Sequence, residues 1–331
     1  MWLGLTADGG PLDDRGGLAH LRATTCAGLR AGYERWLDWV LKRYPEARHE
    51  APAERATAVR LYDWLKDLSG LAPMSRHTLI QRTVIVLSAA DPRQDWSLQR
   101  RIVNRTERTA RHTVSKRKIG RILPSQDLLA AGERLVTEIA AAAPTALSEA
   151  LSIRNGAMVG LLAQLPMRRR SFTELNLGQS VIVSPTQIHI YLSPDMTKNG
   201  LPWEAPVPEA GDVLLRRYVE HIRPWLMARR GQKHHDRLWV DRCGYPLGTQ
   251  GIMEAVVAAT FKTVGVRVSP HLFRDAAATT LSRLSPENAR LIRPLLAHSG
   301  FGTAERHYIQ AQGIETGRDY AAVLAELMED K

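Results

Sequence analysis

The chain has 331 residues, which is long enough for two domains that each bury a hydrophobic core. Its 45 Lys and Arg against 34 Asp and Glu give a net charge of +11, which favours a polyanionic partner such as nucleic acid. The two distant cysteines, Cys26 and Cys243, argue against a disulfide framework and a structural zinc site. The N-terminus shows no signal-peptide pattern, and no uncharged apolar run is long enough to cross a membrane, so we expect a cytoplasmic protein.

The first part of the chain predicts a small helical domain behind a flexible lead-in. Residues 1–17 are rich in Gly and Asp, which is typical of such a lead-in. Hydrophobic residues then recur at helical spacing, and Pro and Gly separate the segments. The expected helices are Leu18–Leu41, Ala53–Leu68, Ser75–Ala89 and Trp96–Val114. Together they predict an all-α domain over residues 18–114.

The last of these helices carries a row of cations. Residues at spacings of three and four share one helix face, and here they are Arg101, Arg105, Arg108 and Arg111. Like charges in such a row repel one another unless phosphates face them. The basic character continues through Lys116 and Lys118 into residues 115–126, which we expect to link two domains. Either these residues contact a nucleic-acid backbone, or they form a solvated helix with a basic linker.

The second part, residues 127–331, predicts a larger domain that is mainly α with a small β-sheet. The expected helices are 127–141, 146–165, 212–230, 249–264, 271–284, 287–296 and 318–328. The expected strands are 180–183, 188–192, 203–207 and 238–240. A turn at Thr197–Gly200 lies between the second and third strands.

Near the C-terminus, residues 269–311 combine several chemically active side chains. His271 and Arg274 form an HxxR pair, which places both on one helical face where they can meet a single anion. His298 and Tyr308 follow. Cations, imidazoles and one phenol suit phosphoryl transfer through a covalent intermediate. The alternative is a set of unrelated helices with surface cations and a core tyrosine.

These residues resemble the C-terminal signature of the tyrosine recombinases, the phage-integrase family. HLFRD matches the His-x-x-Arg of that signature, LLAHSG its Leu-Gly-His, and TAERHYIQA the segment of the nucleophilic tyrosine. Two departures are visible: Ala297 replaces the usual Gly, and the gap after His298 is one residue longer, which puts His307 at the common tyrosine position. Because an imidazole cannot replace a phenol in this chemistry, we assign the nucleophile to Tyr308.

The resemblance extends to the segment LPMRRRSFTELNLG, which stands where the family has its first catalytic arginine. The register of the later leucines selects Arg168, with Arg169 and Arg170 as rivals. Ser171 occupies the position where many relatives have an acid that supports this arginine. Either Glu174 provides the support from one turn later, or the support is absent.

The family also places a lysine on the hairpin between the second and third strands, and Lys198 in DMTKNG stands there. The catalytic residues implied by the resemblance are therefore Arg168, Lys198, His271, Arg274, His298 and Tyr308. The tyrosine would attack the scissile phosphate to give a 3′-phosphotyrosyl bond while the two arginines bind the non-bridging oxygens. The first histidine would help to accept the tyrosine proton, the second would hydrogen-bond the phosphate, and the lysine would protonate the 5′ oxygen.

The implied activity is site-specific recombination without a metal, ATP or any other cofactor. With this resemblance, the basic residues of 101–118 are best interpreted as DNA-backbone contacts, and the two domains as a clamp around duplex DNA. The family further implies a homotetramer on synapsed DNA, possible accessory DNA-bending proteins, and a terminal helix at 318–328 that docks on a neighbouring protomer. The alternatives are a catalytically inactive DNA-binding relative, a type IB topoisomerase-like strand transferase and an RNA-binding protein.

Overall fold

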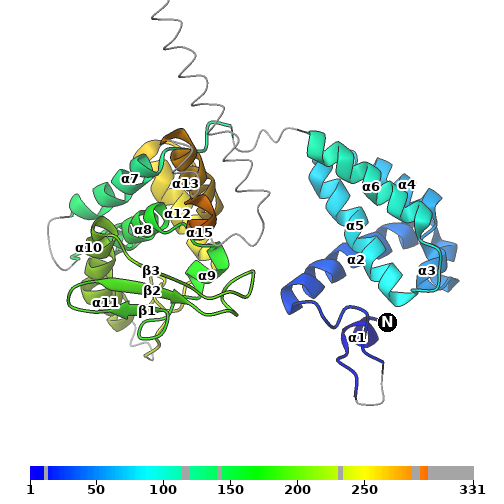
Figure 1. The fold of residues 1–331 in the computed structure, drawn as a ribbon, viewed down its shortest axis with the longest axis horizontal. Helices are drawn as coiled ribbons and strands as arrows, with labels where there is room; N and C mark the ends of the chain where they lie inside the picture. Colours follow the sequence, from blue (N-terminus) through cyan, green and yellow to red (C-terminus); the bar gives the residue numbers. More distant parts are fainter. Residues whose placement is uncertain (11–13, 114–118, 140–143, 230–233, 285–290, 297–331) are drawn as a thin grey trace, which may run out of the picture. The chain divides into compact units, whose positions relative to one another are not determined.

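The structure is a computed structural model that describes residues 1–10, 14–113, 119–139, 144–229, 234–284 and 291–296. The chain divides into two compact units, Met1–Ser115 and Lys116–Lys331 (Figure 1). Each unit has its own hydrophobic core, as expected for a chain of this length.

The first unit is helical. Its elements are α1 (Trp2–Thr6), α2 (Ala23–Arg43), the 3-10 helix η1 (Pro45–His49), α3 (Pro52–Arg55), α4 (Ala58–Asp67), α5 (Pro73–Ala90) and α6 (Ser97–His112). Local chemistry fixes several helix starts. Thr57 caps α4 by accepting a hydrogen bond from the Arg60 amide, and Pro73 occupies the first position of α5, where its missing amide hydrogen costs nothing. Helices α5 and α6 lie close to their predicted ranges, whereas the single helix predicted at Ala53–Leu68 is divided into α3 and α4, because the chain leaves the helical conformation at Ala56 and Thr57 begins a new helix as its cap.

The start of the chain contributes to this core. Within the segment predicted to be a flexible lead-in, α1 forms and its Leu5 is buried. The Leu18 amide donates to the Leu5 carbonyl at 2.8 Å, and Leu18 is also buried. Leu18 is thus held against α1, and α2 begins at Ala23 rather than at Leu18 as predicted.

An aromatic cluster forms the centre of the first unit. The rings of Trp36 and Trp64 lie 5.3 Å apart, and both side chains are fully buried. Trp39 stacks on Trp36 and donates its indole N–H to the Asp67 carboxylate at 2.8 Å. Such rings contribute a large buried apolar area, while the polar edge of Trp39 keeps a partner.

The second unit combines helices with a sheet. Its elements are α7 (Ser125–Thr137), α8 (Leu147–Gln164), α9 (Arg169–Thr173), β1 (Val181–Val183), β2 (Ile188–Leu192), β3 (Trp203–Pro206), α10 (Glu209–Arg217), the π-helical turn η3 (Tyr218–Ile222), α11 (Arg223–Ala228), α12 (Thr249–Val264), α13 (Pro270–Leu284) and α15 (Ile292–Leu296). In the described ranges the strands form one antiparallel sheet in the order β1-β2-β3, with Ile190 paired to Val181 and Ala205. The predicted class, mainly α with a small sheet, is confirmed.

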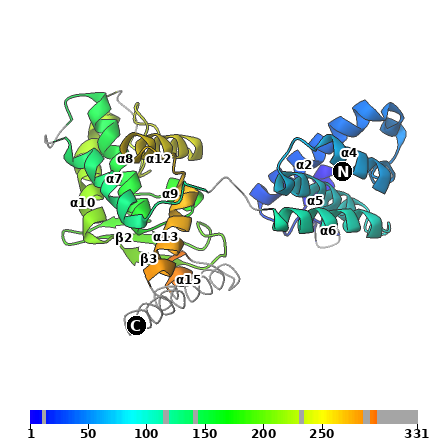
Figure 2. The ribbon, with the colours of Figure 1, turned by 90° about the horizontal axis from the view of Figure 1, so that it is seen from above.

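Helix α8 is the centre of this unit, and α7, α10, α12 and α13 pack around it (Figures 1 and 2). It is buried along most of its length, as its apolar composition on all sides requires. A side chain at Gly132 of α7 would lie 2.7 Å from the Gly160 nitrogen and 2.8 Å from the Gly156 oxygen. The two helices therefore touch backbone to backbone. No helix in the described part of the chain is long and apolar enough to cross a membrane.

Three predictions for this unit differ from the structure. The single helix expected at 212–230 is divided into α10, η3 and α11, and Pro224, which lacks an amide hydrogen, follows the wider π turn. The strand expected at 238–240 is absent from the described structure, which has only isolated bridges at Arg237 and Val240. Helix α9 was not predicted. Residues 285–290 and the expected helix 318–328 lie outside the described residues.

The described part of the predicted linker, residues 119–126, packs on the second unit. The Arg121 guanidinium donates to the Arg267 carbonyl at 3.0 Å, and the Ser125 amide donates to Thr280 Oγ1 at 3.0 Å. Ile122 and Leu123 contact the core of the same unit. These contacts fix the chain up to the start of α7.

Candidate active site and nucleic-acid interface

Arg274 lies on α13 and is only 7% exposed. Its guanidinium donates from Nη1 to the Pro166 carbonyl at 2.7 Å and from Nη2 to the Leu296 carbonyl at 2.6 Å. One side chain therefore connects α13 to the end of the α8 segment and to the last residue of α15. Because these bonds fix the plane of the guanidinium, the remaining N–H groups have a defined direction.

Arg168 is the half-buried residue immediately before α9. Burial lowers the pKa of Arg274 to about 10, and the nearby Arg168 cation lowers it in the same direction, whereas Asp275 opposes the shift. Burial also lowers the pKa of Arg168. Arg274 still carries its charge at neutral pH, since a pKa of about 10 lies well above it. Two partly desolvated cations thus repel each other, and an anion bound near both would relieve their repulsion.

The structure separates the three adjacent arginines. The Arg169 guanidinium lies 3.3 Å from the sulfur of Met253, and Arg169 is exposed. Arg170 is also exposed and forms an ion pair with Glu174 at 2.9 Å. Of the three arginines, only Arg168 contributes to the lowered pKa of Arg274. The carboxylate of Glu174, which was the candidate support for Arg168, is paired with Arg170 instead.

Lys198 is exposed in the connection between β2 and β3, as the hairpin assignment predicts. The preceding Thr197 is 3% exposed, and its hydroxyl oxygen lies 2.8 Å from the Leu201 carbonyl and 3.0 Å from the Pro194 carbonyl. On the other side, the Ser171 hydroxyl donates to the Met196 carbonyl at 2.7 Å. Hydrogen bonds within the loop and one hydrogen bond to α9 therefore fix the backbone that carries Lys198.

His271 is exposed in the first turn of α13, one turn before Arg274. The two residues share one helix, as the HxxR spacing predicts. The other two proposed catalytic residues, His298 and Tyr308, lie outside the described residues. The described chain ends at Leu296, whose carbonyl binds Arg274 two positions before His298.

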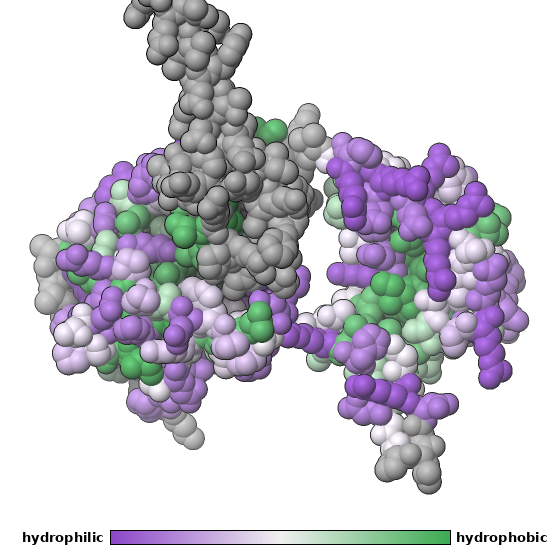
Figure 3. All heavy atoms as spheres, viewed as in Figure 1, coloured by the Kyte–Doolittle hydropathy of each residue, from purple (hydrophilic) through white to green (hydrophobic). Residues whose placement is uncertain are grey.

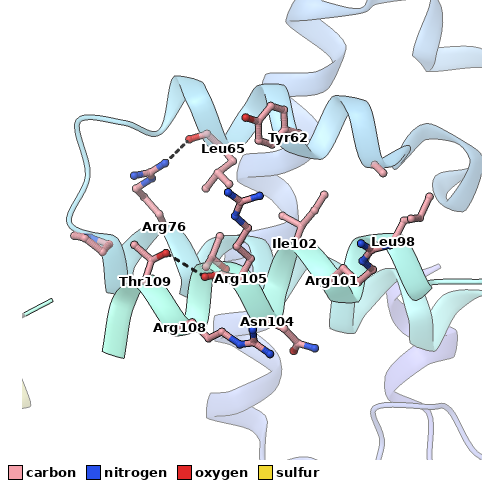
Figure 4. Close-up of a pocket in the computed structure, with 13 residues that line it drawn as sticks. Tyr62, Leu65, Arg76, Leu98, Arg101, Ile102, Asn104, Arg105, Arg108 and Thr109 are labelled. Atoms are coloured by element: carbon pink, nitrogen blue, oxygen red, sulfur yellow. Dashed lines mark hydrogen bonds between the residues drawn. The ribbon is translucent and has the colours of Figure 1, made fainter. Parts of the chain in front are cut away.

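A groove of about 820 Å³ lies between α4 and α6 in the first unit. Arg101, Arg105 and Arg108, three of the four arginines predicted to share a helix face, line it. In Figure 4 the Arg105 side chain rises from α6 towards Tyr62 and Leu65 of α4. Asn104 also lines the groove and lies beside Arg108 along the lower edge of α6 in this view. The groove therefore combines cationic, amide and aromatic groups.

The fourth arginine of the row, Arg111, does not line this groove and forms an exposed ion pair with Glu107 at 2.6 Å. Lys116 and Lys118 lie outside the described residues. Apolar side chains accompany the cations, because Tyr62 and Leu98 of the groove are 51% and 54% exposed. Figure 3 shows the same mixture of hydrophilic and hydrophobic residues on the surface of this unit.

Sequence reasoning did not identify the participation of Tyr62 and Asn104 in the groove, or the link from Ser171 to the lysine loop. Asn104 lies three residues from Arg101 and four from Arg108, so helical spacing could have found it. Tyr62 is on another helix, and only the packing of α4 against α6 brings it to the groove.

The chain was compared with recombinases of known structure. The crystal structure of the XerH site-specific recombinase, bound to a palindromic difH substrate in a post-cleavage complex, is 15% identical with a TM-score of 0.56, covering 82% of this chain and 73% of that chain. This likeness shows a common fold. The XerA recombinase is 16% identical over 91% of this chain and 93% of that chain, with a TM-score of 0.40 that is too low to carry an argument.

Comparison with curated protein sequences gave no match. The model of the phage integrase family matches residues 133–313, which is more than half of the chain and includes α8, α9, the sheet and α13. The protein therefore belongs to the phage integrase family, the tyrosine recombinases.

Proposed function

We propose that this protein is a site-specific DNA recombinase that cuts and rejoins duplex DNA through a 3′-phosphotyrosyl intermediate. The observation that carries the proposal is the convergence of Arg168 and Arg274, two partly desolvated cations from distant parts of the chain. A phosphodiester between them would neutralise their repulsion and accept the planar, forked hydrogen bonds that guanidinium groups provide. Membership of the phage integrase family supports the same chemistry.

In the first step, the Tyr308 oxygen forms a bond to the scissile phosphorus as the bond from phosphorus to the 5′ oxygen breaks. His271 takes the phenol proton, and the Lys198 ammonium gives a proton to the departing 5′ oxygen. Arg168, Arg274 and His298 stabilise the charge on the non-bridging oxygens, which is the main contribution that a protein can make to phosphoryl transfer.

In the second step, the 5′ hydroxyl of another DNA end attacks the phosphotyrosine. Lys198 takes the proton of this hydroxyl, and the tyrosine leaves with a proton from His271. The number of phosphodiester bonds is the same before and after, so the exchange needs no ATP. The chemistry proposed for these residues also uses no metal ion or other cofactor.

The groove between α4 and α6 is proposed to bind the DNA backbone. Arg101, Arg105 and Arg108 form one cationic row, and neutralising phosphates with such residues releases counterions. Asn104 and the exposed ring of Tyr62 add groups that can contact bases or sugars. Arg111, Lys116 and Lys118 extend the proposed cationic surface along the sequence.

We accordingly assign residues 18–114 to DNA binding, 115–126 to the connection and 127–331 to catalysis. A homotetramer on synapsed DNA, accessory DNA-bending proteins and a cytoplasmic location complete the proposal. The fold shared with XerH, which was crystallised with its DNA substrate, supports duplex DNA as the partner.

Covalent trapping tests the proposal. A binding site is first selected from randomised duplexes, and copies of it are then made with single nicks at successive positions. Cleavage next to a nick releases a short strand, so the phosphotyrosyl adduct accumulates and survives denaturation. We expect an adduct from the wild-type protein and none from Tyr308→Phe.

The other outcomes identify the alternatives. Binding without any adduct at any nick position would indicate a catalytically inactive DNA-binding relative. An adduct together with relaxation of supercoiled plasmid by monomers, without synapsis, would indicate a topoisomerase. Tighter binding to RNA than to duplex DNA at matched salt would contradict the proposed substrate.

A further inference from the structure

Ser171 connects the helix that follows Arg168 with the loop that carries Lys198. It lies in α9 and is 3% exposed. Its hydroxyl donates to the Met196 carbonyl at 2.7 Å, and Met196 precedes Lys198 by two residues. A buried hydroxyl with a short hydrogen bond to a loop carbonyl has little freedom, so this bond fixes the loop backbone against α9.

An electrostatic attraction accompanies this hydrogen bond. A hydrogen bond from the Ser193 side chain lowers the pKa of the Asp195 carboxyl, and the nearby Arg170 cation lowers it in the same direction. Arg170 and Ser171 are neighbours in α9, and Asp195 and Met196 are neighbours in the loop. The hydrogen bond from Ser171 therefore holds the loop on α9, and the attraction between the neighbouring Arg170 and Asp195 acts in the same direction.

The loop is also closed internally around the lysine. Thr197 is 3% exposed, and its hydroxyl oxygen lies 2.8 Å from the Leu201 carbonyl. Lys198 thus lies inside a small turn whose two ends are held together. Because the turn is internally fixed, its contact with α9 determines where the Lys198 backbone lies relative to Arg168, the residue immediately before that helix.

We infer that Ser171 is a positioning residue for Lys198, and that α9 sets the position of the general acid relative to the arginine that binds the phosphate. The inference rests on the proposed function, because it assumes that Lys198 protonates the 5′ oxygen. Many relatives have an acid at the position of Ser171. In this chain the hydroxyl group of Ser171 supports the loop that carries Lys198.

A 5′-bridging phosphorothiolate separates this role from a merely structural one. In this substrate sulfur replaces the 5′ oxygen at the scissile phosphate, and a thiolate leaves without a proton because thiols are far stronger acids than alcohols. A variant that has only misplaced the general acid therefore cleaves it normally. A variant with a disturbed phosphate site stays slow on both substrates.

The measurement is the single-turnover rate of adduct formation on the oxygen and sulfur substrates. On the oxygen substrate we expect Ser171→Ala to be slower by about tenfold, since the half-buried Met196 carbonyl loses its donor. Lys198→Ala is expected to be slower by about a hundredfold or more, the usual contribution of a general acid. On the sulfur substrate both variants are expected to react within about twofold of the wild-type protein.

Thr173→Ala is the matched control, because Thr173 lies in the same helix and its hydroxyl donates to the Arg169 carbonyl at 2.8 Å, within α9. We expect it to match the wild-type protein on both substrates. Ser171→Cys nearly keeps the side-chain volume but has only a weak donor, so it replaces the alanine variant if that variant does not fold. It is expected to show the same substrate dependence with a smaller loss.

The outcomes are distinguishable. Equal losses on both substrates, or no loss on the oxygen substrate, in the folded Ser171 variants would overturn the inference while leaving the proposed function intact. If Lys198→Ala stays slow on the sulfur substrate, Lys198 is not the general acid and the inference fails with that assignment. If the wild-type protein forms no adduct on either substrate, the proposed function itself is wrong.

Discussion

The protein has two groups of arginines that differ in how they are held. Arg168 and Arg274 in the second unit are partly or fully buried, and Arg274 is fixed by two backbone carbonyls. Arg101 and Arg105 in the first unit both lie on α6 and line the groove between α4 and α6. Folding has already removed Arg168 and Arg274 from water, in part or in full, before any ligand binds. Arg101 and Arg105 remain exposed to water.

This difference matches two tasks. A cation that stabilises a transition state must already be in place, because reorganisation during the reaction would raise the barrier. A cation that binds a polyanion needs only to be near it, and the released counterions supply much of the free energy. Arginines of the second unit are therefore expected to influence the reaction rate, and arginines of the first unit the affinity for DNA.

The largest effect is expected at Arg274. Arg274→Ala removes a preorganised donor and leaves the Pro166 and Leu296 carbonyls without theirs, so adduct formation should fall by about a thousandfold. Arg274→Lys keeps the charge but cannot bond to both carbonyls and a phosphate with a planar fork, so we expect it to stay nearly as slow. Single-turnover adduct formation at saturating protein measures the effect. A near-normal rate for Arg274→Lys would show that charge alone suffices.

The next effect separates the adjacent arginines. Arg168→Ala is expected to slow adduct formation by about a hundredfold at saturating protein, because one of two converging phosphate donors is lost. Arg169→Ala is the control, since Arg169 is exposed against Met253, and we expect a change of about twofold or less. The reverse order of the two variants would move the catalytic assignment to Arg169.

The smallest effect is expected in the groove. Arg105→Ala should weaken DNA binding by about three- to tenfold and reduce the slope of log K against log salt by about one, with little change in rate at saturation. Arg111→Ala should do less, because Arg111 is paired with Glu107. Fluorescence titrations at several salt concentrations measure both.

Arg30→Ala provides the control for this prediction. Arg30 lies in α2 of the same unit and pairs with Glu34 at 2.7 Å on the surface. Its loss should leave the salt slope unchanged. If Arg30→Ala and Arg105→Ala weaken binding equally, the groove has no special role and only the net charge of the unit matters.

Much of the fold could be predicted from the sequence where local signals were strong. Helix α12 has the predicted bounds Thr249–Val264, because Gly265 ends it in the left-handed conformation with a φ of 69°. Strand β2 also has its predicted bounds, Ile188–Leu192. By contrast, α9 has five residues, too few to show a helical period, and the 238–240 segment pairs only at isolated bridges.

The site was predictable as a family signature and less so as geometry. The sequence could select Arg168 from three neighbours only through the register of the resemblance. In the structure, Arg274 donates to the carbonyl of Pro166, two residues before Arg168, and the Arg168 cation lowers the pKa of Arg274. The bond from Ser171 to Met196 joins segments that are 25 residues apart, and no periodicity predicts it. The catalytic roles of all six residues, Arg168, Lys198, His271, Arg274, His298 and Tyr308, stay predictions.

The glycine contact between α7 and α8 has a consequence for the chemistry. Because a Cβ atom at Gly132 or Gly156 would collide with the backbone of the other helix, these glycines allow α7 and α8 to pack at short range and so set their separation. Beyond the far end of α8 comes Pro166, whose carbonyl receives Arg274. The α7–α8 contact thus helps to set the position of the Arg274 guanidinium, for which we propose phosphate binding. We expect Gly132→Ala to slow turnover in a protein that still binds DNA.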